Sequence, residues 1–101
     1  MRRMLESLTL GDFFERIGEE FLVAAGETTV DLVLVETTDF ARRENPGPRR
    51  SPFSLIFRGP SAPVLAQKTY ALENAALGRL EIFLVPIGPD ASGMRYEAIF
   101  N

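Results

Sequence analysis

The chain has 101 residues, of which 46% are hydrophobic, and this size and composition predict one folded domain with a sizeable apolar core. Its formal net charge of −3 argues against nucleic acid or an anionic membrane surface as a partner. The sequence has no cysteine and no histidine, which excludes disulfides, thiolate nucleophiles and the imidazole groups that most often act as general bases or metal ligands. We therefore expect no enzymatic activity, no cofactor and no metal.

The N-terminal segment does not predict a targeting signal. Arg2 and Arg3 make its start basic, but acidic residues, Glu6 and Asp12, come soon after them, and no apolar run typical of a signal peptide occurs there. The longest apolar run, near residues 82–87, is far shorter than the ~20 residues that cross a bilayer. We expect a soluble protein that is cytoplasmic on synthesis, and membership of an exported or phage-like assembly would need another export route.

A short helix is predicted over about residues 10–17. Thr9 followed by Asp12 resembles a capping box, which places a carboxylate near the positive end of the helix dipole. Gly18 suits the left-handed residue that commonly comes after the last helical turn. Spacings of three and four place four apolar residues on one stripe of this helix: Leu10, Phe13, Phe14 and Ile17.

From residue 19 onward the apolar period changes to two, which is typical of strands. A first strand places Phe21 and Val23 on one face and ends at a turn over residues 25–27. A second strand spans residues 28–38 and is rich in β-branched residues. Its first face carries Val30, Leu32 and Leu34, and its second face also carries apolar side chains, Val33 and Val35.

Residues 39–51 hold four arginines, two prolines and a glycine without any period, so we predict an Arg- and Pro-rich loop there. Alternation resumes over 52–59, with Phe53, Leu55 and Phe57 on one face. Three further strands, over 68–73, 79–87 and 94–100, are separated by turn sequences at 74–78 and 88–93 and form two hairpins.

These elements predict a mainly β fold, a small antiparallel six-stranded barrel or sandwich in which the N-terminal helix closes one open end. We find no internal repeat and no composition shift that would divide the chain, so residues 1–101 form a single β domain.

Several segments resemble a family of roughly hundred-residue bacterial proteins of unknown function. The similarity lies in residues 5–9 with Asp12 and Phe13, in Pro52–Pro60, in Ile82–Asp90 and in Gly93–Asn101, and it covers nearly the whole chain. Members of that family often lie beside genes for phage-tail-collar-like proteins, so the resemblance implies a structural or assembly role. It assigns no functional residue.

Basic residues cluster in the predicted loop, where they would suit an acidic surface of a partner or a phosphate, although a solvated loop is the simpler interpretation. They are Arg42, Arg43, Arg49 and Arg50. If the loop binds anything, one candidate is an acidic patch on a neighbouring copy, formed by Glu19, Glu20, Glu27 and Asp31.

Two strands are apolar on both faces, through Val33 and Val35 in one and through Phe83, Val85 and Ile87 in the other. Such strands are covered by other parts of the chain or by another subunit. The leading hypothesis is therefore a non-enzymatic structural or assembly protein that self-associates or packs into a tail-like or filamentous complex. The alternative is a module that binds a small ligand or peptide in the barrel interior or its mouth.

The sequence contains no convincing set of catalytic residues. Glu81 and Glu97, on neighbouring strands, are the best carboxylate pair, but they alternate with core residues as solvent-facing glutamates do. Ser54 and Ser92 lack a histidine to activate them, and Lys68 alone does not make a serine–lysine dyad. We predict ordinary surface roles for these residues.

Overall fold

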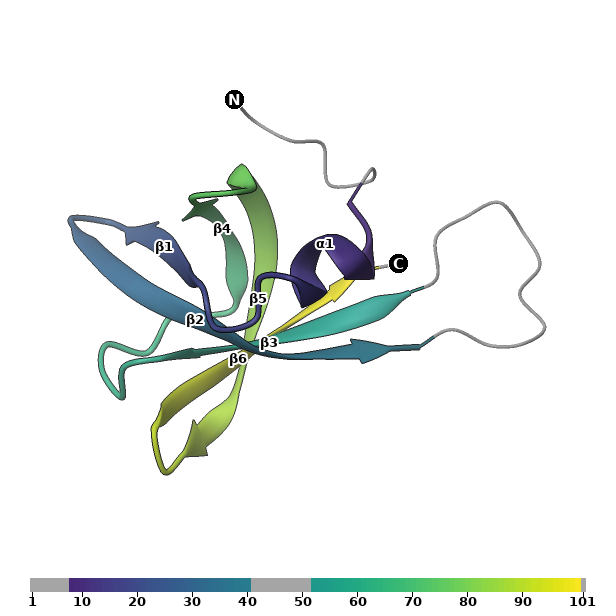
Figure 1. Ribbon diagram of the computed structural model, residues 1–101. Coiled ribbons are helices and arrows are strands. Elements are labelled where there is room, and N and C mark those ends of the chain that lie inside the picture. The colour runs from purple at the N-terminus through teal and green to yellow at the C-terminus, as the bar shows by residue number, and fades with distance from the viewer. Residues whose placement is uncertain (1–7, 41–51, 101) are drawn as a thin grey trace.

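A computed structural model describes residues 8–40 and 52–100 (Figure 1). A mainly β fold with an N-terminal helix is confirmed, and most of the Arg- and Pro-rich loop predicted over 39–51 lies outside the described residues. The elements in chain order are α1 (Leu10–Phe14), β1 (Glu20–Ala25), β2 (Thr28–Asp39), β3 (Phe53–Gly59), β4 (Lys68–Asn74), β5 (Gly78–Asp90) and β6 (Gly93–Phe100).

The strands close into an antiparallel barrel in the order β1-β2-β3-β6-β5-β4. The hairpins predicted for the last three strands are confirmed, because β4 pairs with β5 and β5 pairs with β6. Closure depends on two pairings between strands distant in sequence, β3 with β6 and β1 with β4. The β1–β4 seam is the shortest in the barrel, since it joins only Leu22 to Glu73 and Val23 to Leu72.

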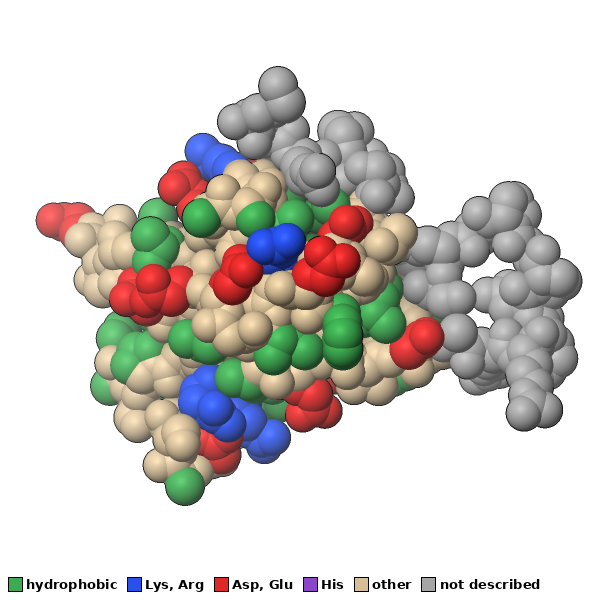
Figure 2. All heavy atoms as spheres, in the orientation of Figure 1, with side chains coloured by type: hydrophobic (Ala, Val, Ile, Leu, Met, Phe, Trp, Pro, Cys, Tyr) green, Lys and Arg blue, Asp and Glu red, His purple; other side chains and the backbone are tan. Residues whose placement is uncertain are grey.

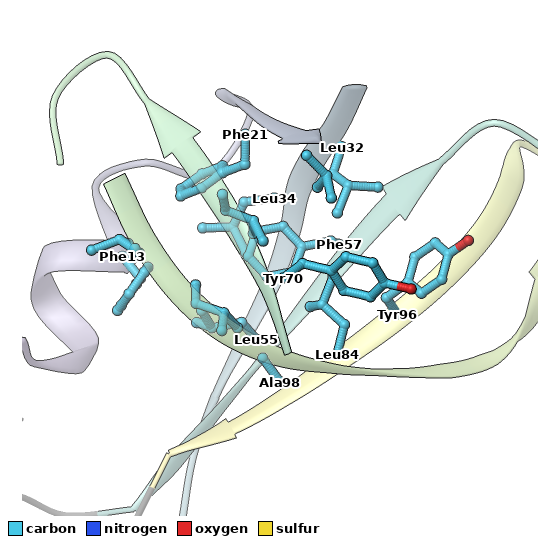
Figure 3. Packing of buried hydrophobic residues seen from close by; sticks show 14 of the residues in the cluster. Phe13, Phe21, Leu32, Leu34, Leu55, Phe57, Tyr70, Leu84, Tyr96 and Ala98 are labelled. Carbon is cyan, nitrogen blue, oxygen red and sulfur yellow. The ribbon is translucent and has the colours of Figure 1, made fainter. Parts of the chain in front are cut away.

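Alternate residues of every strand point into the barrel, as the period of two predicts. Figure 3 shows side chains from distant strands converging there, with Phe21, Leu34, Phe57 and Tyr96 among them. Phe21 and Phe57 meet edge to face, with ring centroids 5.1 Å apart. The inward faces predicted from the sequence are thus confirmed, and the barrel interior is filled by protein side chains.

Helix α1 closes one end of this core. Phe13 is fully buried, with its ring centroid 5.9 Å from that of Phe53 and 5.3 Å from that of Phe100. The predicted cap is present, because the Asp12 carboxylate accepts a hydrogen bond of 2.8 Å from the backbone N–H of Thr9. Burying one phenylalanine contributes roughly 1.5–3 kcal/mol, so Phe13 is the main anchor of the helix.

The helix is shorter than the predicted span of 10–17. It ends at Phe14, and turns lead on to Gly18, which has a φ of 94°. The predicted apolar stripe is therefore wrong for its outer members, since Phe14 is 62% exposed and Ile17 42% exposed. The cause is early pairing with β2: the backbone N–H of Gly18 donates to the carbonyl of Leu34 at 2.7 Å and pulls the chain out of the helical path.

The turn predicted over 88–93 is also shorter. The β5–β6 pairing shifts register between Pro86 and Gly88 and then continues to the pair formed by Asp90 and Gly93. Gly88 adopts a φ of 107°, which a bulge can use to bend the strand without ending it. Only two residues are left to form the turn.

We predict that Gly93→Ala destabilises the protein by about 2–3 kcal/mol in urea unfolding. Gly93 has a φ of 148°, and a Cβ at this position would lie 2.1 Å from the backbone oxygen of Gly59. Gly11→Ala is the matched control, because its Cβ would lie no closer than 3.7 Å to Thr9, and it should change stability by at most about 1 kcal/mol. Equal stabilities for the two variants would contradict the close approach of these strands.

Candidate interaction surface

The outer wall of the barrel carries apolar side chains on strands whose inner side is already buried. Val33, Val35 and Val85, which the sequence singled out, are partly buried on this outer wall. Phe83 is 50% exposed, and Ile99 on β6 is 59% exposed. The prediction that β2 and β5 are apolar on both faces is borne out by the structure.

The strand register brings these residues together. On β6, Glu97 pairs with Ile56 of β3 on one side and with Val85 of β5 on the other. Ile99 is the next outward residue on β6, and Phe83 is the next on β5. We call this set the outer apolar face: Val33, Val35, Ile56, Phe83, Val85 and Ile99.

In Figure 2, hydrophobic side chains form a band across the middle of the barrel wall, with acidic side chains above it and most of the basic ones in that region below it. On the side of the barrel that this view shows, charged side chains thus border the apolar band. Exposed apolar side chains gathered in this way are typical of a surface that another molecule covers.

An ion pair fixes the hairpin that borders this face. Arg58 of β3 donates from Nε to both carboxylate oxygens of Asp90, at 3.2 and 3.0 Å, and from Nη2 to Oδ2. Asp90 also accepts a hydrogen bond of 2.8 Å from the backbone N–H of Ser92. The hydrogen bonds from Arg58 lower the pKa of the Asp90 carboxyl below its usual value, with the Ser92 amide adding to the effect.

The neighbouring Arg95 is a second guanidinium at the same place. It pairs in register with Arg58, and its Nε is buried without a hydrogen-bond partner among the described residues. The rim beside Val33 is thus basic, although Asp90 compensates one of its two charges.

A groove opens where the β1–β4 seam ends. Its volume is about 640 Å³. It is lined by Arg16, Gly18, Glu19, Glu20, Leu22, Glu73, Asn74, Ala75 and Ala76. Two of the acidic residues that the sequence proposed as an acceptor, Glu19 and Glu20, therefore lie together in one depression, whereas Glu27 and Asp31 do not line it.

Asn74 organises one wall of this groove. Its Nδ2 donates to Oε1 of Glu19 and to the backbone carbonyl of Glu20, each at 3.1 Å. Its Oδ1 accepts from the backbone N–H groups of Ala76 and Leu77, each at 2.9 Å. The buried side chain of Asn74 thus joins the end of β4 to the start of β1, at the shortest seam of the barrel.

The residues considered for catalysis do not form a site in the described part of the chain. Glu97 pairs with Val85 and Glu81 lies four residues further along β5, roughly 13 Å away along the strand. Ser54 is buried, the Ser92 amide caps the hairpin turn, and Lys68 stacks over Tyr70 at 5.3 Å. Within residues 8–40 and 52–100, no group of acidic residues is arranged to hold a metal ion.

Sequence reasoning missed part of this surface. Ile99 lies at an outward position of β6, where the other outward-facing side chains are charged. This single apolar residue among charged ones was the signal that could have identified it. The Arg58–Asp90 pair had no such signal, because the partners lie on strands joined only by the barrel order. Arg42, Arg43, Arg49 and Arg50 lie outside the described residues, so their proposed contacts stay a prediction.

The fold and the surface together define a small closed antiparallel β barrel that carries an apolar face on its outer wall. Residues 8–100 match the family described as Domain of unknown function (DUF6916), and the chain belongs to that family. The predicted resemblance to a family of about hundred-residue domains of unknown function is confirmed in this respect. No curated protein and no solved structure is significantly similar to the chain.

In the part of the chain that the structure describes, α1 is five residues long, and no helix there has the length and hydropathy to span a membrane.

We predict that Asp90→Asn lowers the thermal midpoint at pH 7, because Arg58 then loses its charged partner. Since the folded pKa of Asp90 is lowered, this stabilisation is complete above the unfolded pKa, near ~4, and is lost as the pH falls through the folded value. The midpoints of wild type and variant should converge as the pH falls from about 5 through the folded pKa of Asp90. A gap that stays constant over this range would contradict the linkage, and Asp31→Asn, which is exposed on β2, serves as control.

Proposed function

We propose that this protein is a non-enzymatic structural or assembly protein that self-associates through its outer apolar face. The observation that supports this proposal most strongly is the exposure of Phe83 and Ile99, at 50% and 59%, beside Val85 on adjoining strands. The interior of the barrel is already filled, so these side chains have no further place to pack within the described residues.

Covering this face with a second copy is favourable by elementary physical chemistry. Fully burying one large apolar side chain contributes roughly 1.5–3 kcal/mol relative to leaving it in water. The face spans four adjacent strands, β2, β3, β6 and β5, and it includes one acidic neighbour, Glu97 of β6, which lies between Ile56 and Val85. The charged residues at its margins, Arg58 and Arg95 among them, suit a polar rim that sets orientation.

The assembly that we propose is a tail-like or filamentous complex, formed with further copies or with other assembly proteins. The same proposal includes synthesis in the cytoplasm and incorporation into an exported or phage-like assembly. It also states that the protein binds no nucleic acid, no membrane and no cofactor. The acidic net charge of the chain supports the exclusion of nucleic acid.

A second candidate function is a binding module for a small ligand or peptide, and the groove at the β1–β4 seam favours it. At about 640 Å³ the groove has the volume of a ligand site. The barrel interior does not support this alternative, because its space is occupied by residues such as Phe57, Tyr70 and Tyr96 (Figure 3).

The test of self-association is the double substitution Phe83→Lys with Ile99→Lys. Two charges in the outer apolar face should weaken self-association by at least about tenfold, because each lysine would have to be desolvated in the contact. Sedimentation velocity over a range of protein concentrations measures the effect.

Val64→Lys is the matched control, because Val64 is 53% exposed but lies in the connection between β3 and β4 and on none of the strands that form the outer apolar face. It should leave the sedimentation profile unchanged. A wild-type protein that sediments as a monomer at every concentration, or equal effects of all these substitutions, would contradict the proposal.

A further inference from the structure

The groove at the β1–β4 seam is lined by both apolar and acidic side chains. Leu22, Ala75 and Ala76 line it, together with the carboxylates of Glu19, Glu20 and Glu73. The exposed Leu22 and Glu73 face each other across the seam as one of its two register pairs. The groove therefore runs along the seam where the barrel wall is least complete.

Its carboxylates are not equivalent. Glu19 is engaged, because Arg16 donates to Oε2 at 2.9 Å and Asn74 donates to Oε1 at 3.1 Å. Arg16 also lies 3.6 Å from Glu15, so its charge is already shared between two carboxylates. Glu20 and Glu73 are exposed, and neither forms an ion pair with any residue in the ranges 8–40 and 52–100. The groove thus offers two carboxylates that form no ion pair with the described residues, beside apolar side chains, and the nearest cation to Glu73 in the strand register is Arg79 of β5.

A segment of complementary charge exists in the same chain. Residues 42–50 carry four arginines and one glutamate, and they connect two strands that end far from the groove. We propose that the groove at the β1–β4 seam binds the Arg-rich segment 42–50 of a second copy, with Glu20 and Glu73 pairing with its arginines. This inference rests on the proposed self-association, and it names a contact that would set how one copy is oriented relative to the next.

A contact between two copies fits the chain lengths better than a contact within one copy. The N–H of Phe40 donates to the carbonyl of Pro52 at 2.9 Å, so these two residues, which flank the segment, lie next to each other. All four arginines lie within three residues of Phe40 or Pro52, so their Cα atoms reach at most roughly 11 Å from these anchors. Glu20 pairs with Val33, six residues before Asp39, which is about 20 Å back along β2, and Glu73 lies on the next strand.

The geometry has a consequence for symmetry. The acceptor groove and the donated segment are different surfaces of the chain, so the contact is heterologous and joins copies head to tail. Such a contact closes into a ring or continues as a filament, in contrast to a twofold contact, which ends with a dimer. Arginine suits this role because its guanidinium pairs with carboxylates through two parallel hydrogen bonds.

The first experiment uses a synthetic peptide with the sequence of residues 40–52 as the probe. Calorimetric titration onto the full chain should show binding that weakens with added salt, because exposed charges are screened over about 8 Å at 0.15 M. Each of Glu20→Gln and Glu73→Gln should weaken binding by about two- to fivefold. A peptide with all four arginines replaced by glutamine should not bind, and binding that is insensitive to both groove variants overturns the proposal.

The second experiment uses charge reversal in the full chain. The double variant Arg49→Glu/Arg50→Glu and the double variant Glu20→Lys/Glu73→Lys should each associate less than wild type in sedimentation velocity. Mixed in equal amounts they should associate again, because one donates an intact segment and the other an intact groove. Circular dichroism before mixing establishes that both are folded. Wild-type association by the groove variant alone, or no recovery on mixing two folded variants, overturns the proposal.

These readouts separate the two claims. If Phe83→Lys with Ile99→Lys abolishes association while groove reversal has no effect, the proposed function stands and the groove contact is wrong. If the wild-type chain is monomeric, the proposed function fails, and the peptide titration still decides whether the groove binds the Arg-rich segment.

Discussion

Closure of a six-stranded ring around a filled interior is the constraint on which the rest of the structure depends. Each strand turns every second side chain inward, and the interior accepts only those side chains. Phe21, Leu34, Phe57 and Tyr96 meet there from strands far apart in the sequence (Figure 3). An apolar residue of the opposite parity cannot join this core, whatever its hydrophobicity.

That constraint explains why apolar side chains lie on the outer wall, and the proposed function depends on these side chains. Phe83, Val85 and Ile99 have outward parity on adjoining strands, so closing the barrel leaves them on the surface. A second effect of closure appears at the seam where β1 meets β4 over a short stretch, because the groove forms there. The two surfaces are distinct, and the assembly we propose uses both: the apolar face supplies burial and the groove supplies direction.

The sequence was sufficient for features that depend on local pattern. The period of two located all six strands to within three residues at each end, and the turn compositions identified both C-terminal hairpins. The capping pair Thr9 and Asp12 was recognisable because its partners lie three residues apart. The family resemblance was likewise visible in the sequence motifs of the chain, and it agrees with the match over residues 8–100.

Features that depend on closure were not predictable in the same way. The helix ends at Phe14 because Gly18 already pairs with Leu34, and a helical spacing contains no information about that contact. Similarly, the Arg58–Asp90 ion pair and the Asn74 bridge to Glu19 join residues that are 32 and 55 positions apart. They come together only through the strand order, which one sequence does not specify. The alternating pattern of β6 was enough to predict that Ile99 points outward. It was not enough to predict which residues of neighbouring strands lie beside Ile99.

The central claim, that copies meet through the outer apolar face, is tested most directly by proximity between copies. The chain contains no cysteine, so a single cysteine introduced by Val85→Cys or by Val64→Cys is the only thiol in the protein. Treatment with a short bismaleimide should cross-link Val85→Cys into covalent dimers at micromolar concentration and leave Val64→Cys monomeric in a denaturing gel. Equal yields for the two variants, or no dimer from Val85→Cys while the folded protein still self-associates, would contradict the account.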